Sequence, residues 1–237
     1  MNDQLIIFLV ISSTSLVQSL FGVGVLLFGT PTLLLLKFNF FDVLNILLPI
    51  SLAINMLQIS NNFKDINKIA ARDLVTIVLP IIAITLTLAS DIIVDFSMAV
   101  GVFLIVISLS NFISFNLSSI IQGKLYLVLM AIIHGITNLG GSLLAGYFSI
   151  KNWDKTKTRT NIAFFYFAFA ATQLITLHLN AKFIPQKNSY LYITLGVTIF
   201  YLTNKIIFQK INESLFSKLI SLILFIFGFM LIIKFYL

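Results

Sequence analysis

Polar side chains stand at helical spacing inside an otherwise apolar run at residues 43 to 59. Ser51, Asn55 and Gln58 fall within roughly 60° of arc at about 100° per residue, so they share one face of the expected helix. Polar groups at membrane depth usually face the interior of a bundle, where they find partners. These side chains can line a path for a polar solute, or they can hold two helices together. Both interpretations stay open.

A second polar stripe lies in the later half of the chain. Arg159, Tyr166 and Gln173 are spaced by seven residues and therefore lie on one helix face. An arginine guanidinium is always charged and offers a planar fork of donors that suits oxyanions. We expect Arg159 at the cytoplasmic mouth of a pathway, where it would attract a small anion. Hydrogen bonding between helices is the alternative role for this stripe as well.

Glycine-rich breaks interrupt two long apolar runs, at Gly22-Val23-Gly24 and between Asn138 and Ser142. Backbone that is freed inside a membrane must face protein or a water-filled cavity. In secondary transporters such half-helix ends direct unpaired N–H and C=O groups at the solute, and helix N-termini suit oxyanions. The alternative is close helix packing at small residues. Clustering at both breaks favours a binding role.

His134 precedes the second break and is the histidine expected well inside the membrane, since His178 lies near a helix end. It can bind an anion or carry a proton, because an unperturbed imidazole titrates near pH 6.5. A neutral, hydrogen-bonded structural histidine is the alternative. Acidic residues fall in loops or at the ends of apolar runs. No carboxylate is therefore predicted at mid-membrane depth to bind sodium or shuttle protons.

The two breaks and the two stripes together supply the predicted substrate-binding residues. These are Gly22, Val23, Gly24, Thr30, Asn55, Gln58, His134, Asn138, Gly140, Gly141, Ser142, Arg159, Tyr166 and Gln173. No catalytic residue, metal ligand or cofactor is expected, because the chain has no cysteine, acidic pair or HExxH-like helix. A secondary transporter of a small anion is the leading hypothesis. The alternatives are a membrane-embedded enzyme and an accessory or scaffold subunit.

The composition is that of an integral membrane protein. The 237 residues are 59% hydrophobic and only 10% charged, where a soluble domain carries about 25% charged residues, and the mean hydropathy is +1.06. No removable signal peptide is expected, because the N-terminus has no basic residue and no cleavage pattern follows. Most of the 15 basic residues behind the net charge of +7 lie in loops, so the charge first indicates membrane orientation and only weakly an anionic substrate. No nucleic-acid partner is expected. A homo-oligomer is left open.

The elements that must position these residues form two similar halves. The run from Leu5 to Leu36 has 32 residues, while one crossing needs about 20, so two shortened legs meeting at a tip are expected. Each half is predicted to hold one glycine-broken hairpin and three transmembrane helices, in a single all-α domain over 1–237. The repeats are expected at 1–120 and 121–237. The three runs of each half are 43–59, 74–90 and 96–115, then 161–179, 190–203 and 215–237, with loops expected at 60–73 and 91–95.

The distribution of basic residues separates two topologies, because cytoplasmic loops are enriched in Lys and Arg. If both broken segments return to their own side, the inside loops hold 11 basic residues and the outside loops hold 4. If both segments cross once, the best split is 7 against 8. The first model makes the halves inverted repeats, as is common in secondary transporters. It places the loop at 151–160 in the cytoplasm and both termini outside.

Two glycine-rich stretches carry a resemblance to a known family. Ser19 to Gly24 with Thr30-Pro31, and later His134-Gly135 with Asn138 to Gly141, resemble the paired segments of the sulfite exporter TauE/SafE family. The usual first motif there is a glycine triplet followed by proline, whereas Val25 follows Gly24 here. The resemblance covers most of the chain. It implies a multi-pass permease of a bacterial-type plasma membrane that moves sulfite, a sulfonate or a related organic anion.

Overall fold

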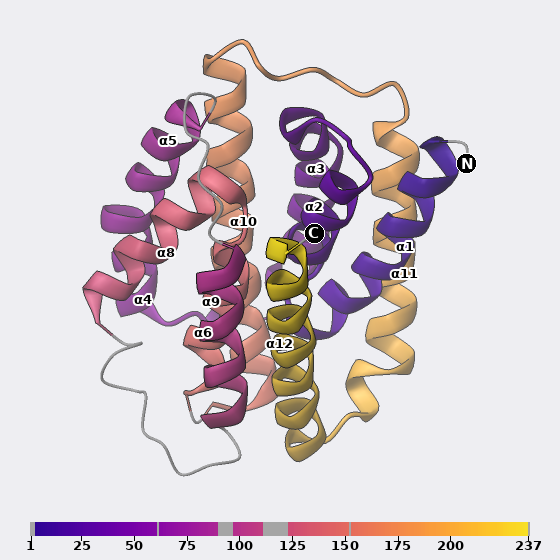
Figure 1. The fold of residues 1–237 in the computed structure, drawn as a ribbon. Coiled ribbons are helices and arrows are strands. Elements are labelled where there is room, and N and C mark those ends of the chain that lie inside the picture. The colour runs from indigo at the N-terminus through magenta and orange to yellow at the C-terminus, as the bar shows by residue number, and fades with distance from the viewer. Residues whose placement is uncertain (1–2, 61, 90–96, 111–122, 152, 237) are drawn as a thin grey trace. The chain divides into compact units, whose positions relative to one another are not determined.

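The computed structural model describes the chain except for residues 1–2, 61, 90–96, 111–122, 152 and 237, and the described part is helical (Figure 1). The chain divides into two compact units, which are Met1–Ile66 with Arg159–Ile211 and Asn67–Thr158 with Asn212–Leu237. Each unit therefore combines segments from both halves of the sequence. The predicted inverted repeats remain a prediction.

The first unit is built from long apolar helices. It contains α1 (Asp3–Phe21), α2 (Val25–Leu35), α3 (Phe40–Ser60), η1 (Phe63–Asp65), α10 (Lys155–Leu179) from Arg159 onward, α11 (Ser189–Ile206) and η3 (Phe208–Lys210). Helix α1 packs along α11, and α3 packs against both α2 and α11. Figure 1 shows the indigo α1 beside the orange α11. Segments distant in sequence thus lie side by side in this unit.

The first broken segment differs in one respect from the predicted pair of shortened legs. Helix α1 has 19 residues and is by itself long and apolar enough to cross a membrane, whereas α2 has only 11. The expectation of two short legs is therefore wrong for α1. The reason is that the helix begins at Asp3, before the apolar run starts at Leu5, and continues without a break to Phe21. The two legs pack against each other.

The second unit holds the remaining helices. These are α4 (Lys68–Asp73), η2 (Leu74–Val78), α5 (Leu79–Leu88), α6 (Ser97–Ser110), α8 (Lys124–Thr137), α9 (Gly140–Ser149) and α12 (Glu213–Tyr236). Helix α5 packs along α8, and α6 packs along α12, as the magenta and yellow ribbons show (Figure 1). The α6–α12 approach is close, because a Cβ built on Gly101 would lie 2.7 Å from the Gly228 carbonyl oxygen.

Part of the loop predicted at 60–73 is helical. Helix α4 begins at Lys68 and continues through η2 and α5 to Leu88. The Asn67 side chain accepts a hydrogen bond from the backbone N–H of Ala70 at 2.9 Å, which caps this start. Hydropathy placed the start of the apolar run at residue 74, because the turn before it, Lys68–Asp73, is polar. The residues of that turn nevertheless favour a helix.

The second broken segment is interrupted between two short helices. Helix α8 has 14 residues and α9 has 10. Asn138, at the end of α8, has a φ of 62° in the left-handed region, which Asn tolerates better than most residues. Six long apolar candidate membrane spans are found among the described residues, so the multi-pass all-α architecture is confirmed. The predicted continuation of a span to 115 and the loop at 91–95 lie largely outside the described residues.

Candidate functional site

The first helix break depends on two glycines for different reasons. Gly22 has a φ of +79°, and a Cβ there would lie 2.7 Å from the Arg159 carbonyl oxygen. Gly24 has an extended φ of 172°, but a Cβ there would overlap the backbone nitrogen of Gln18 and lie 2.6 Å from the backbone carbonyl oxygen of Thr14. Gly22 thus supplies the left-handed turn, and Gly24 supplies the close approach of α2 to α1.

Gln18 is the centre of the polar network at this break. Its Oε1 accepts a hydrogen bond from the Val25 backbone N–H at 2.9 Å, and its Nε2 donates to Asn55 Oδ1 at 3.1 Å. The same Nε2 lies 3.2 Å from both the carbonyl and the hydroxyl oxygen of Ser51. The first N–H of α2, expected to face a solute, is therefore already satisfied. Gln18 is not among the residues predicted from the sequence, although it is a polar side chain within an apolar run; Gln58 was predicted because it shares a helix face with Ser51 and Asn55.

The predicted stripe on α3 is buried, and its three residues share a face as expected. Ser51, Asn55 and Gln58 are each at most 2% exposed. Gln58 Nε2 donates to the carbonyl oxygens of Gln18 at 2.8 Å and Ser19 at 3.2 Å. These bonds join α3 to the end of α1, so the stripe does hold helices together. Gln58 Oε1 has no hydrogen-bond partner within the described part of the chain.

Arg159 brings a buried positive charge to the same break. Its side chain is only 4% exposed, and its Nη1 donates to the Ser19 carbonyl oxygen at 3.0 Å and to Asn204 Oδ1 at 2.9 Å. The guanidinium carbon lies 3.4 Å from the centre of the Phe208 ring, a cation–π contact. Across the described residues the guanidinium forms no ion pair, and its Nε has no hydrogen-bond partner.

The Ser19 carbonyl oxygen is the point where these groups meet. It accepts from both Gln58 and Arg159, and it lies in the last turn of α1, where the partial charge of the helix is negative. Sequence analysis did not assign Ser19, Asn204 or Phe208 to the site. The site thus consists of a neutral network that closes the break and a cation held beside it by neutral partners.

A comparison with protein families places this geometry in context. The model of the family described as sulfite exporter TauE/SafE matches residues 7–231. The chain belongs to the TauE/SafE family. Members of this family are membrane transporters, not enzymes, so the sequence-based resemblance and the non-enzyme prediction are confirmed. Comparisons with curated proteins and with solved structures gave no match.

Three further predicted residues of this TauE/SafE protein lie in the first unit. Thr30, Tyr166 and Gln173 are fully buried, and the Tyr166 ring lies 5.9 Å from that of Phe169. Val23, between the two glycines, is buried as well. Burial agrees with the prediction that these positions face the interior of the bundle. Their part in binding a substrate stays a prediction.

The remaining predicted residues surround the second break of the TauE/SafE chain. His134, Asn138, Gly140, Gly141 and Ser142 are buried. A Cβ built on Gly140 would overlap the Cβ of His134, so α9 begins directly against α8. The Ser142 hydroxyl donates to the Leu139 carbonyl oxygen at 2.6 Å and thus has a partner inside the segment. The structure brings these five residues together, and their binding role stays a prediction.

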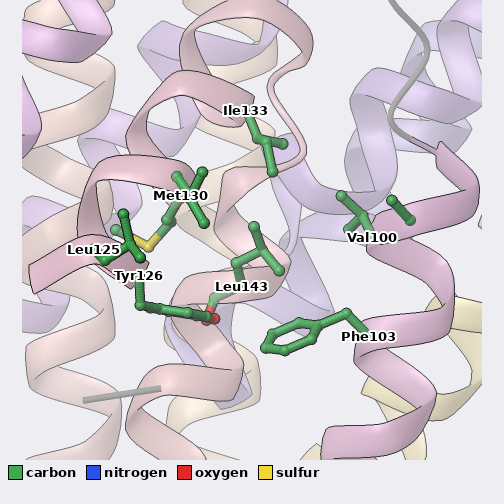
Figure 2. Close-up of a pocket in the computed structure, with 9 residues that line it drawn as sticks. Val100, Phe103, Leu125, Tyr126, Met130, Ile133 and Leu143 are labelled. Carbon is green, nitrogen blue, oxygen red and sulfur yellow. The ribbon is translucent and has the colours of Figure 1, made fainter. Parts of the chain in front are cut away.

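A cavity in the second unit has the wrong chemistry for the anions expected of a TauE/SafE protein. It measures about 280 Å³ and is lined by apolar side chains of α6, α8 and α9, including Phe103, Met130 and Leu143 (Figure 2). Its one hydroxyl, on Tyr126, donates to the Leu143 carbonyl oxygen at 2.6 Å. The lining therefore offers no charged group to an anion. Within the described residues, no cluster of His, Asp or Glu can hold a metal ion either.

Proposed function

We propose that this TauE/SafE protein is a secondary transporter of a small oxyanion such as sulfite, a sulfonate or a related organic anion. In this proposal Arg159 beside the first helix break is the group that binds the anion. Membership of a transporter family supports the activity. The buried guanidinium, which forms no ion pair within the part of the chain that the structure describes, supports a negative charge on the substrate.

The observation that carries the proposal is the uncompensated charge of Arg159. Removing a cation from water costs several kcal/mol, and neutral partners repay this only in part. Ionisable residues inside membrane proteins accordingly mark substrate pathways. A bound oxyanion would supply the missing negative charge. It would also accept from Nε, the guanidinium donor without a partner within the described part of the chain.

Neighbouring groups hold the arginine ready for that contact. The bonds from Nη1 to Ser19 and Asn204 hold one edge of the guanidinium, while the Phe208 ring covers its face. Thr160, the next residue on α10, is buried and its hydroxyl has no hydrogen-bond partner among the residues that the structure describes. It would give an oxyanion a second donor. The neutral Gln18 network keeps the break in place during binding.

The experiment that tests the proposal is a flux assay with the purified protein in liposomes. Sulfite, sulfate, thiosulfate, short sulfonates and carboxylates are offered in turn, with and without a pH gradient. We expect saturable flux of at least one oxyanion and none of an uncharged solute of similar size. Absence of flux for every anion, by protein whose correct insertion has been verified, would refute the proposed substrate class.

A further inference from the structure

A second cavity, with polar walls, opens where two long helices begin. It measures about 280 Å³, and its lining includes the residues Lys151, Trp153, Thr158, Glu213 and Ser217. All of these residues belong to the second unit. The proposed anion transport does not use them.

Two opposite charges line this cavity without neutralising each other. Lys151 Nζ lies 4.7 Å from the centre of the Tyr147 ring and 5.3 Å from that of Trp153. The Glu213 carboxylate accepts a hydrogen bond from the Lys155 backbone N–H. No ion pair joins Lys151 to Glu213 in the described structure. A ligand that carries one positive and one negative group would pair with both.

The position of the cavity along the helices indicates that it lies at the depth of the lipid headgroups. Candidate membrane spans begin beside it at Lys155 and at Glu213. Lys157 Nζ lies 4.8 Å from the Trp153 ring centre, and Trp beside basic residues is typical of a membrane interface. The buried Phe216 and Ile220, one and two turns further along α12, complete the lining. The cavity thus has polar walls at the helix starts and an apolar wall toward the expected bilayer.

From this arrangement we propose that the cavity binds a phosphoethanolamine group, as carried by the headgroup of phosphatidylethanolamine. Lys151 and the Ser217 hydroxyl bind the phosphate, and Glu213 accepts from the primary ammonium. An anionic headgroup without an amine can bind through its phosphate but brings no positive charge to Glu213. A choline headgroup carries the charge but has no N–H to donate to Glu213. Soluble phosphoethanolamine shares the chemistry, so the test must separate the two sources.

The test uses the full-length purified protein in detergent. Phosphatidylethanolamine, phosphatidylglycerol, phosphatidylcholine and soluble phosphoethanolamine are added separately, and both retained ligand by native mass spectrometry and the thermal midpoint are measured. The variants are Lys151→Gln and Glu213→Gln, whose amides keep hydrogen-bonding capacity. Lys218→Gln, at an exposed lysine of α12 outside the cavity lining, is the matched control.

We expect phosphatidylethanolamine to be retained in preference to the other two lipids. Lys151→Gln should weaken its retention about tenfold, as for loss of a charge-assisted bond. Glu213→Gln should abolish the preference over phosphatidylglycerol, and Lys218→Gln should change neither. Equal binding by soluble phosphoethanolamine would support the same site with a soluble ligand. Equal retention of all lipids by the unchanged protein, or an equal loss in Lys218→Gln, would overturn the proposal.

Discussion

At the scale of single residues, the buried charge of Arg159 and the buried side-chain amide of Gln18 have different roles at the first break. Among the described residues Arg159 bonds the neutral groups of Ser19 and Asn204 and forms no ion pair, so in the proposed function its charge is available to a ligand. Gln18 uses both ends of its amide inside the protein, so it has a structural task. Substitutions at these two positions should therefore affect transport and stability differently.

Replacing Arg159 should weaken anion handling more than folding. Arg159→Gln should raise the half-saturating anion concentration about tenfold or more, because a charge-assisted hydrogen bond is worth about 1.5 to 3 kcal/mol. Arg159→Lys should recover only part of this, since an ammonium lacks the planar fork. Initial rates against anion concentration in liposomes measure the effect. Arg72→Gln, at a largely exposed arginine, is the control and should behave as the unchanged protein.

Replacing Gln18 should destabilise the protein. Gln18→Leu removes the acceptor of the Val25 N–H and the donor to Asn55, and buried groups left without partners cost about 1 to 3 kcal/mol each. We expect the thermal midpoint in detergent to fall by about 5 °C or more. Gln209→Leu, at an exposed glutamine of η3, should change the midpoint little. An unchanged midpoint in Gln18→Leu would show that the network does not stabilise the break.

At the scale of elements, the first break is a rigid turn rather than a loose kink. The reversal from α1 to α2 takes only Gly22 to Gly24, and the backbone of α2 begins within contact distance of the last two turns of α1. A side chain at either glycine meets backbone atoms, which cannot move aside as a flexible side chain can. The geometry of the break is therefore tied to the absence of Cβ atoms.

Adding a Cβ at the break should be costly, and more so than at a third glycine nearby. Gly22→Ala combines an unfavourable φ with a contact of 2.7 Å to the Arg159 carbonyl oxygen, so we expect a loss of stability of about 1 to 3 kcal/mol. Gly24→Leu should abolish flux while insertion continues. In Gly29→Ala, the three atoms nearest to the added Cβ all belong to the Leu47 side chain, with Cδ1 at 2.8 Å, and the end of a side chain can move. We expect flux and the thermal midpoint to be reduced least in the Gly29 variant and more strongly in the Gly22 and Gly24 variants. Normal transport by Gly24→Leu would show that the break serves packing alone.

At the scale of the whole molecule, the distribution of basic residues among the loops predicts the orientation of the chain in the membrane. The predicted topology places 11 of the 15 basic residues in the cytoplasm, including those at 151–160. The chain contains no cysteine. A thiol reagent therefore labels the protein only at a cysteine that is introduced, and the labelling shows on which side of the membrane that position lies. Two lysines predicted on opposite sides provide a matched pair.

Labelling from outside intact cells should distinguish those two sides. A cysteine placed at Lys155 should resist an impermeant thiol reagent, whereas one placed at Lys182 should react. Both should react after the membrane is permeabilised, which verifies that each thiol is accessible. Ready labelling at Lys155 in intact cells would overturn the hairpin topology and with it the inverted repeats.

Much of the architecture could be predicted from local patterns. Hydropathy predicted the apolar runs, and glycine clusters predicted both helix breaks, because these features depend on residues close together in sequence. Periodicity placed Ser51, Asn55 and Gln58 on one buried face for the same reason. The start of α4 was missed because its polar turn is helical without being apolar.

Tertiary packing alone decided which groups meet at the break. Nothing in the spacing of Gln18, Asn55 and Arg159 indicates that they gather around the end of α1. The bond from Gln18 to Asn55 crosses 37 residues of sequence, and the bond from Arg159 to the Ser19 carbonyl oxygen crosses 140. Nor does an arginine in a basic loop show that it will be buried beside neutral partners instead of a carboxylate. The sequence by itself determined a membrane protein with two glycine-broken segments, because composition and local backbone freedom act along the chain. Which buried polar groups are bonded, as Gln18 is, and which keep a donor without a partner among the described residues, as Arg159 does at Nε, was decided by their neighbours in space, because only the fold brings partners from distant parts of the chain together.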